Sequence, residues 1–113
     1  MPKHDFGIIQ KIPNKRYEHY EPQKYNCISI DDDFIQPIIE DLSTLDTFCH
    51  TLKIPSKGLI YNGITLIPPS SLRQFQSILI DNRNYENDFQ FEKLIQLIDK
   101  AILEDKYIIH FGI

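Results

Sequence analysis

The chain has 113 residues, of which 42% are apolar and 25% are charged, and its formal net charge is −4. This length suits one domain with a substantial core and is too short for two. The negative charge argues against a protein that binds nucleic acid by neutralising phosphates. No apolar run approaches the roughly 18 residues of a membrane span, and the N-terminus has no secretory signal features. We therefore expect one cytoplasmic domain, residues 1–113, that binds neither nucleic acid nor membrane.

Five segments have the composition of β-strands. They are residues 4–12, 25–30, 46–53, 58–67 and 107–113. Gly7 in the first segment suggests a bulge or a close backbone approach. Residues 46–53 alternate as a strand does but could also continue the preceding helix. The most apolar run, GLIYNGITLI at 58–67, ends before Pro68, since proline cannot donate to a strand ladder. This run is the predicted central strand.

Three segments are predicted helices. They begin at Asp31–Asp33, at Ser70–Ser71 and at Asp88, where short polar side chains can cap a helix, and they end near Leu42, Ile80 and Glu104. The third shows an apolar stripe with helical spacing, formed by Phe91, Leu94, Ile95, Ile98 and Ile102. The elements together predict an α+β fold, in which about three helices pack on a mostly antiparallel sheet of four to five strands.

Few residues have a spacing that indicates chemistry. His4, His50 and His110 lie in predicted strands, but neither HExxH nor CxxC occurs, so we predict no metal and no cofactor. An enzyme with an across-strand site formed by His50, His110 and Cys49 is one alternative. Adjacent residues on a strand point to opposite faces, which weakens the pair Cys49 and His50. Buried, hydrogen-bonded histidines are the simpler interpretation. Cys27 and Cys49 are expected to be reduced and mostly buried.

The distribution of charge along the chain says more about a possible function than these motifs do. Residues 31–46 contain six acids and no Lys or Arg, so this window carries −6 while the rest of the chain carries +2. The acids are Asp31, Asp32, Asp33, Glu40, Asp41 and Asp46. A surface of one sign speeds encounter with a cationic partner, although a solvated helix would have the same composition. Tyr17 and Tyr20 lie among charges in a polar loop, a composition found both in binding rims and in ordinary loops. We predict that these acids and tyrosines bind a partner.

Four stretches carry a resemblance that covers about half of the chain. They are HDFGI at 4–8, YEPQKYNCISIDDD at 20–33, GLIYNGITLIPPSSL at 58–72 and IIHFGI at 108–113. Here the chain resembles a family of small uncharacterised bacterial proteins, some of which have been labelled short-chain dehydrogenases. It has no GxGxxG pattern and is too short for a Rossmann domain. In size and charge it is similar to the immunity proteins carried beside secreted bacterial toxins.

That similarity implies an immunity protein that neutralises a basic toxin, such as a nuclease, by direct binding. It leaves two alternatives open: a small enzyme with the across-strand histidine and cysteine site, and a structural or ligand-binding module.

Overall fold

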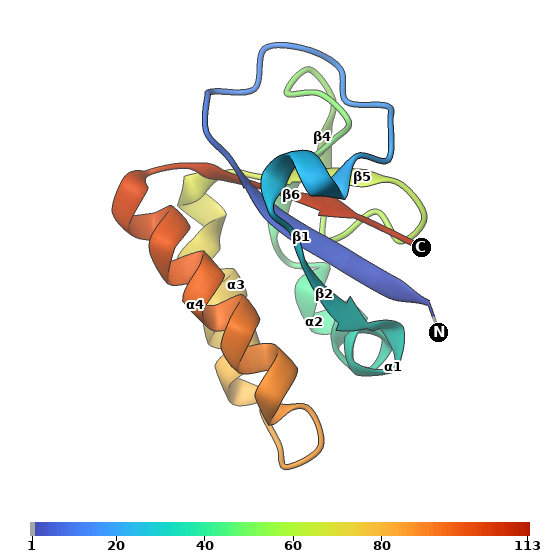
Figure 1. The fold of residues 1–113 in the computed structure, drawn as a ribbon, viewed down its shortest axis with the longest axis vertical. Coiled ribbons are helices and arrows are strands. Elements are labelled where there is room, and N and C mark those ends of the chain that lie inside the picture. The colour runs from blue at the N-terminus through green and yellow to red at the C-terminus, as the bar shows by residue number, and fades with distance from the viewer. Residues whose placement is uncertain (1) are drawn as a thin grey trace.

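The computed structural model describes residues 2–113, and in this part of the chain six strands form one antiparallel sheet (Figure 1). The strands are β1 (Lys3–Ile9), β2 (Ile28–Asp31), β3 (Asp46–Cys49), β4 (Pro55–Lys57), β5 (Ile64–Ile67) and β6 (Tyr107–Phe111). Their order across the sheet is β2-β1-β6-β5-β3-β4. The last strand therefore lies between the first strand and β5, so that His110 is opposite Phe6 on one side and Thr65 on the other.

Helical segments connect and cover the strands. They are η1 (Pro22–Tyr25), α1 (Asp32–Ile35), η2 (Gln36–Ile38), α2 (Ile39–Leu42), α3 (Pro69–Asp81) and α4 (Asp88–Glu104), of which η1 and η2 are 3₁₀ helices. The long helices α3 and α4 lie against each other on one face of the sheet (Figure 1). The short segment from α1 to α2 packs beside them. The predicted α+β class is confirmed, with more strands than expected.

The two faces of the sheet bury different cores because neighbouring residues on a strand point to opposite sides. Ile108 belongs to the large core between the sheet and the helices, whereas Ile109 belongs to a smaller cluster on the other face. Tyr17, Tyr25 and Leu52 pack against that smaller cluster. All residues of the predicted α4 stripe join the large core, four of them buried and Ile102 half-buried. The periodicity of α4 is therefore confirmed as a packing face.

All five predicted strands are shorter than their sequence patterns, and Tyr25 of the predicted strand 25–30 lies instead in η1. The strands predicted at 46–53 and 58–67 are shortened most. Only Ile64–Ile67 of the run 58–67 forms a strand, because Gly58 has a left-handed φ of 67° and a turn precedes Ile64. Residues 46–53 also end their strand early, at Cys49, since His50 has a φ of 64°. A left-handed residue cannot continue the pleat of a strand. Both departures give the chain the sharp turns that place β4 and β5 on either side of β3.

Four other local predictions are corrected. The N-cap of α4 is Asn87, and Asp88 is the first residue of the helix. The segment 32–42 is broken by η2 at Pro37, whose ring cannot fit inside a regular helix. Helix α3 has Pro68 as its N-cap, and the Ser71 hydroxyl instead donates to the Asp46 carbonyl at 2.6 Å. The ladder runs through Gly7 without a bulge. A Cβ on Gly7 would lie 2.7 Å from Tyr25 Cβ, so the predicted close approach is confirmed.

Candidate functional site

A buried chain of hydrogen bonds links β5, β6, β1 and α1. Thr65 Oγ1 is 3.0 Å from His110 Nδ1, His110 Nε2 is 2.9 Å from His4 Nδ1, and His4 Nε2 is 2.8 Å from Asp32 Oδ1. The Tyr61 hydroxyl donates to both oxygens of Asp32, at 2.5 and 2.6 Å. We call these residues the histidine relay. Thr65, His110 and His4 have no exposed surface, and Asp32 is 7% exposed.

One arrangement of hydrogens satisfies the whole relay. The Thr65 hydroxyl donates to His110, His110 donates to His4, and His4 donates to an ionised Asp32. Each imidazole is then neutral and uses one nitrogen as donor and the other as acceptor. The carboxylate at the end of the relay is thus the charge around which both histidines are oriented.

The surroundings of the relay shift three pKa values. Burial, together with the neighbouring His4, holds the pKa of His110 well below its ordinary value of 6.5. Burial raises the pKa of Asp32, but hydrogen bonds from Tyr61 and His4 outweigh it, so that the pKa is lowered. The hydrogen bond to Asp32 raises the pKa of Tyr61. These shifts favour the neutral imidazole of His110 and the charged carboxylate.

The relay resembles the acid–histidine pairs of hydrolases, but its hydroxyl cannot be reached. A nucleophile must contact substrate, and the Thr65 side chain is fully buried. In this conformation the relay therefore joins strands from both ends of the chain and fixes the start of α1.

The structure does not bring together the residues of the alternative across-strand site. Cys49 and His110 are both opposite Thr65, on either side of β5. They are therefore about 10 Å apart, two strand spacings. His50 lies beyond the end of β3, where its Nδ1 donates to the Tyr17 carbonyl at 2.6 Å. Cys27 and Cys49 are free thiols that are half-buried rather than buried.

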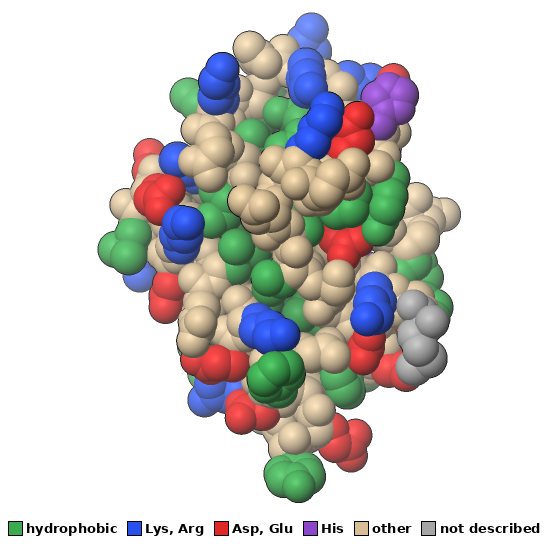
Figure 2. All heavy atoms as spheres, in the orientation of Figure 1, with side chains coloured by type: hydrophobic (Ala, Val, Ile, Leu, Met, Phe, Trp, Pro, Cys, Tyr) green, Lys and Arg blue, Asp and Glu red, His purple; other side chains and the backbone are tan. Residues whose placement is uncertain are grey.

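The acidic segment meets the α3–α4 loop at one end of the molecule. The Gln90 amide donates to the Asp31 carboxylate at 3.0 Å, and Asn82 Nδ2 donates to Asp41 at 3.3 Å. We call the exposed and half-exposed carboxylates of this region the acidic end: Asp31, Asp33, Glu40, Asp41, Glu86, Asp88 and Glu92. Figure 2 shows mainly Lys and Arg side chains toward its upper end, whereas toward its lower end many Asp and Glu side chains lie interspersed with a few Lys and Arg side chains. The charge asymmetry of the sequence is thus also an asymmetry of the surface.

Two predicted binding acids do not contribute to this surface. Asp32 is buried, because its carboxylate points inward to His4 and Tyr61. Asp46 is exposed but forms an ion pair with Lys57 across the β3–β4 hairpin. The amino-acid sequence does not distinguish these two acids from their neighbours. Burial and pairing depend on strand contacts that the sequence does not specify.

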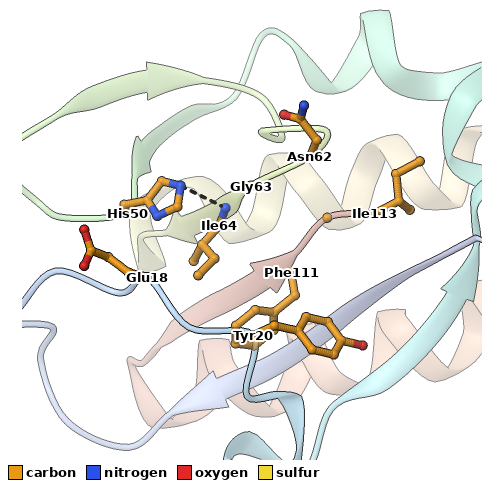
Figure 3. A pocket seen from close by; sticks show the side chains of 9 residues that line it. Glu18, Tyr20, His50, Asn62, Gly63, Ile64, Phe111 and Ile113 are labelled. Carbon is orange, nitrogen blue, oxygen red and sulfur yellow. Dashed lines mark hydrogen bonds between the residues drawn. The ribbon is translucent and has the colours of Figure 1, made fainter.

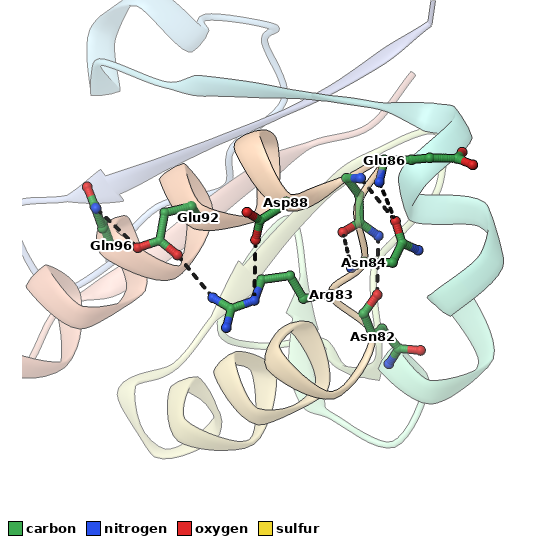
Figure 4. Close-up of polar contacts among 8 residues, drawn as sticks. Asn82, Arg83, Asn84, Glu86, Asp88, Glu92 and Gln96 are labelled. Carbon is green, nitrogen blue, oxygen red and sulfur yellow. Dashed lines mark hydrogen bonds and ion pairs between the residues drawn. The ribbon is translucent and has the colours of Figure 1, made fainter.

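Two exposed aromatic side chains, which were not among the residues predicted to bind a partner, lie at the same end. Tyr85 is 99% exposed and Phe89 is 74% exposed. Figure 4 shows the loop that carries Tyr85, in which the backbone N–H of Asn84 donates to Asn87 Oδ1 at 2.9 Å and that of Asn87 donates to Asn84 Oδ1 at 3.1 Å. Arg83 bridges Asp88 and Glu92 at 3.4 and 3.1 Å. A tyrosine between asparagines in a polar loop was the available signal.

The predicted tyrosines lie away from the acidic end. Tyr17 is half-buried against the smaller core, and its N–H donates to the His50 carbonyl at 2.8 Å. Tyr20 is 67% exposed, and its hydroxyl donates to Asp5 at 2.7 Å. Tyr20 and Lys24 have the YxxxK spacing that is found in short-chain dehydrogenases. Lys24 forms an ion pair with Glu21 at 2.8 Å, whereas the Tyr20 hydroxyl binds Asp5, so the two side chains do not act together.

Within residues 2–113, no group of three or more His, Cys, Asp or Glu side chains is arranged to hold a metal ion. No helix in the described part of the chain combines the length and apolar composition that crossing a membrane requires. Comparisons with protein-family models, with curated proteins and with solved structures found no match. The resemblance to small bacterial proteins and the function it implies therefore stay predictions.

Proposed function

We propose that this protein binds a second protein with a cationic surface through its acidic end, and that it acts in the cytoplasm as an immunity protein against a basic toxin. The observation that carries the proposal is the clustering of carboxylates from two distant parts of the chain, residues 31–41 and 86–92. Arg83 is already paired with Asp88 and Glu92. The remaining carboxylates leave this end with a net negative field.

The charges suit fast association. Asp33, Glu40 and Asp41 are exposed, and none has an ion-pair partner among residues 2–113. Exposed charges of one sign steer an oppositely charged partner and raise the association rate more than they slow dissociation. Their reach is about 10 Å at 0.1 M salt, so steering weakens as salt is added.

Tyr85 has the properties of an anchor at the same surface. Tyrosine is enriched among residues that dominate binding energy, because it buries a large ring and keeps a polar tip. The asparagine hydrogen bonds hold the Tyr85 loop in one conformation, which lowers the entropy lost on binding. Lys93 Nζ lies 4.3 Å from the Phe89 ring centroid and orients the neighbouring aromatic side chain. The carboxylates of the acidic end would attract the partner, and the Tyr85 ring would pack against it, so both belong to one interface.

The test measures binding to the product of the gene adjacent to that of this chain. Glu40→Lys with Asp41→Lys should slow association by about tenfold at low salt and change dissociation less. The difference should shrink as ionic strength rises toward 0.5 M, where the Debye length is about 4 Å. Tyr85→Ala should instead speed dissociation by about tenfold, since a well-placed aromatic contributes more than 1 kcal/mol.

Asp99→Lys with Glu104→Lys is the charge-matched control, because it changes the net charge equally but on α4, at residues outside the acidic end. Circular dichroism and thermal unfolding establish that each variant is folded. Equal association rates for the two charge-reversed variants would mean that net charge, and not the acidic end, governs encounter. No binding to the adjacent gene product would reject the immunity role.

A further inference from the structure

A cavity of about 470 Å³ opens between the end of β1, the loop that follows it and η1. It is lined by Tyr17 and Tyr25, whose side chains also pack against the smaller core. Lys11, Lys15 and Lys24 line it as well, and the described residues around it include no Asp or Glu. The cavity therefore has only cationic and uncharged lining residues, in a chain whose net charge is −4.

Two of these lysines are free charges. Residues 10–27 contain four Lys or Arg and two Glu, and each Glu already pairs with a cation of the same segment. The pairs are Arg16 with Glu18, at 2.7 Å, and Lys24 with Glu21, at 2.8 Å. Lys11 and Lys15 have no ion-pair partner within residues 2–113. Lys15 Nζ lies 5.1 Å from the Tyr17 ring centroid, so its ammonium is held beside the ring.

The two tyrosines add neutral hydrogen-bond donors. Burial, with a smaller effect of the neighbouring Tyr25, raises the pKa of Tyr17. Burial, with a smaller effect of Glu21, also raises the pKa of Tyr25, against the opposite effect of Lys24. Both phenols are therefore protonated at neutral pH. Neither hydroxyl is hydrogen-bonded to another side chain in the described part of the chain, so both can donate to a ligand.

The loop that carries these groups is fixed at its middle. The Tyr17 N–H donates to the His50 carbonyl at 2.8 Å, and His50 Nδ1–H donates back to the Tyr17 carbonyl at 2.6 Å. Three residues further on, the Tyr20 ring meets Phe111 edge to face, with centroids 5.6 Å apart (Figure 3). The Tyr20 hydroxyl donates to Asp5 at 2.7 Å. A loop that is held before binding loses less entropy when a ligand binds.

We infer that this cavity binds a small phosphate monoester that carries a planar ring, the chemistry of a mononucleotide. A phosphate monoester has a charge of about −1.5 to −2 near pH 7, which matches the two unpaired ammoniums of Lys11 and Lys15. Ammonium and phenol groups donate to phosphate oxygens, and tyrosine rings stack on planar bases. The volume of the cavity is that of a small-ligand site. Two free cations suit one phosphate and not the run of phosphates in a nucleic-acid strand.

The inference does not rest on the proposed immunity function. Residues 10–20 lie at the upper end of the molecule in Figure 1 and the α3–α4 loop at its lower end, along a longest dimension of 39 Å. Charges are screened beyond about 10 Å at 0.1 M salt, so the acidic end does not cancel the field of the lysines. Loss of one binding activity need not affect the other, and each is measured with its own probe.

The experiment is an NMR titration of the folded chain with AMP, in a buffer free of phosphate. Ribose 5-phosphate lacks the base, and adenosine lacks the phosphate. We expect saturable shifts of the amides of Lys11, Lys15 and Tyr17 with AMP, and binding of each of the two partial ligands that is weaker by about tenfold or more. Equal affinities for AMP and adenosine would reject the phosphate site. Equal affinities for AMP and ribose 5-phosphate would reject the stacking of a ring.

A pair of matched variants tests the site itself. Lys11→Gln with Lys15→Gln removes the two free charges at exposed side chains, and it should weaken AMP binding by roughly tenfold or more. Lys3→Gln with Lys100→Gln removes the same charge at exposed residues that do not line the cavity, and it should leave binding unchanged. Amide spectra establish that both variants are folded. Absence of saturable AMP shifts in the parent protein, or equal affinities in the two variants, would overturn the inference.

Discussion

His4 Nδ1 and His110 Nε2 lie 2.9 Å apart, although 106 positions separate the two residues in the chain. Their rings are stacked, with centroids 5.1 Å apart. The contact exists because β1 and β6 are antiparallel neighbours at the centre of the sheet. The relay therefore joins the two terminal strands and α1 in one polar cluster, and its protonation should be linked to folding.

The first prediction concerns stability and pH. Folding lowers the pKa of His110, so between the lowered value and 6.5 the unfolded chain binds more protons than the folded chain. The stabilisation is complete above pH 6.5 and is lost as pH falls toward the lowered pKa. The free energy of unfolding should fall by up to about 1.4 kcal/mol per pH unit in this window. Urea unfolding between pH 8 and pH 5 measures the slope.

The lowered pKa of Asp32 also makes the free energy of unfolding fall as the pH falls, but in a lower pH range. Its contribution to stability is fully present above the ordinary pKa of 3.8 and is lost as the pH falls through the lowered pKa. His110→Gln should flatten the slope between pH 6.5 and pH 5. His19→Gln is the control, since His19 is exposed in the loop before η1. A slope that persists unchanged in folded His110→Gln would show that another group is responsible.

The second prediction concerns Cys27. Burial, with a smaller effect of Asp5, raises the pKa of the Cys27 thiol to about 12. Only the thiolate reacts with alkylating agents, so at pH 8 Cys27 should react about a thousandfold more slowly than an unperturbed thiol. The Cys49→Ser variant isolates Cys27 for timed iodoacetamide labelling. The rate should rise to that of a free cysteine in urea, and rapid labelling of the folded variant would contradict the assigned burial.

The third prediction concerns the packing of α4. Leu94 is fully buried between α4 and the sheet, whereas Leu103, on the same helix, is 86% exposed. Leu94→Ala should cost about 2–5 kcal/mol of unfolding free energy through lost burial and a residual cavity. Leu103→Ala makes the same chemical change and should stay within about 0.5 kcal/mol of the parent. Equal losses in urea unfolding would mean that helix propensity, and not packing, determines both.

The fourth prediction concerns the turn before β5. Gly58 has a φ of 67°, and its N–H donates to the Leu45 carbonyl at 2.8 Å. A Cβ there would lie 2.8 Å from Ser43 Cα, which is backbone and cannot move aside alone. Gly58→Ala should lower the free energy of unfolding by about 1–3 kcal/mol, from left-handed strain and this contact. Ser56→Ala, in the adjacent strand β4, is the control. A neutral Gly58→Ala would show that the turn can rearrange.

The local elements were largely predictable because they depend on periodicity along the chain. The apolar stripe of α4 follows from residues three and four apart, which share a helix face whatever surrounds them. The α+β class followed from the order of these periodic segments. The left-handed residues Gly58 and His50 were not predictable in this way, because the turns they make are set by the pairing of β3 with β4 and β5.

The sequence determined that the chain has a one-signed acidic window, amphipathic helices and histidines in strands. Only the tertiary structure decided that Asp32 turns inward while Asp33 stays exposed, and that Tyr85 joins the acidic end. The physical reason is that strand order and register bring together residues that are far apart in sequence. Antiparallel pairing of the terminal strands places His4 and His110 on one face, and no spacing within either strand specifies which strand will be its neighbour.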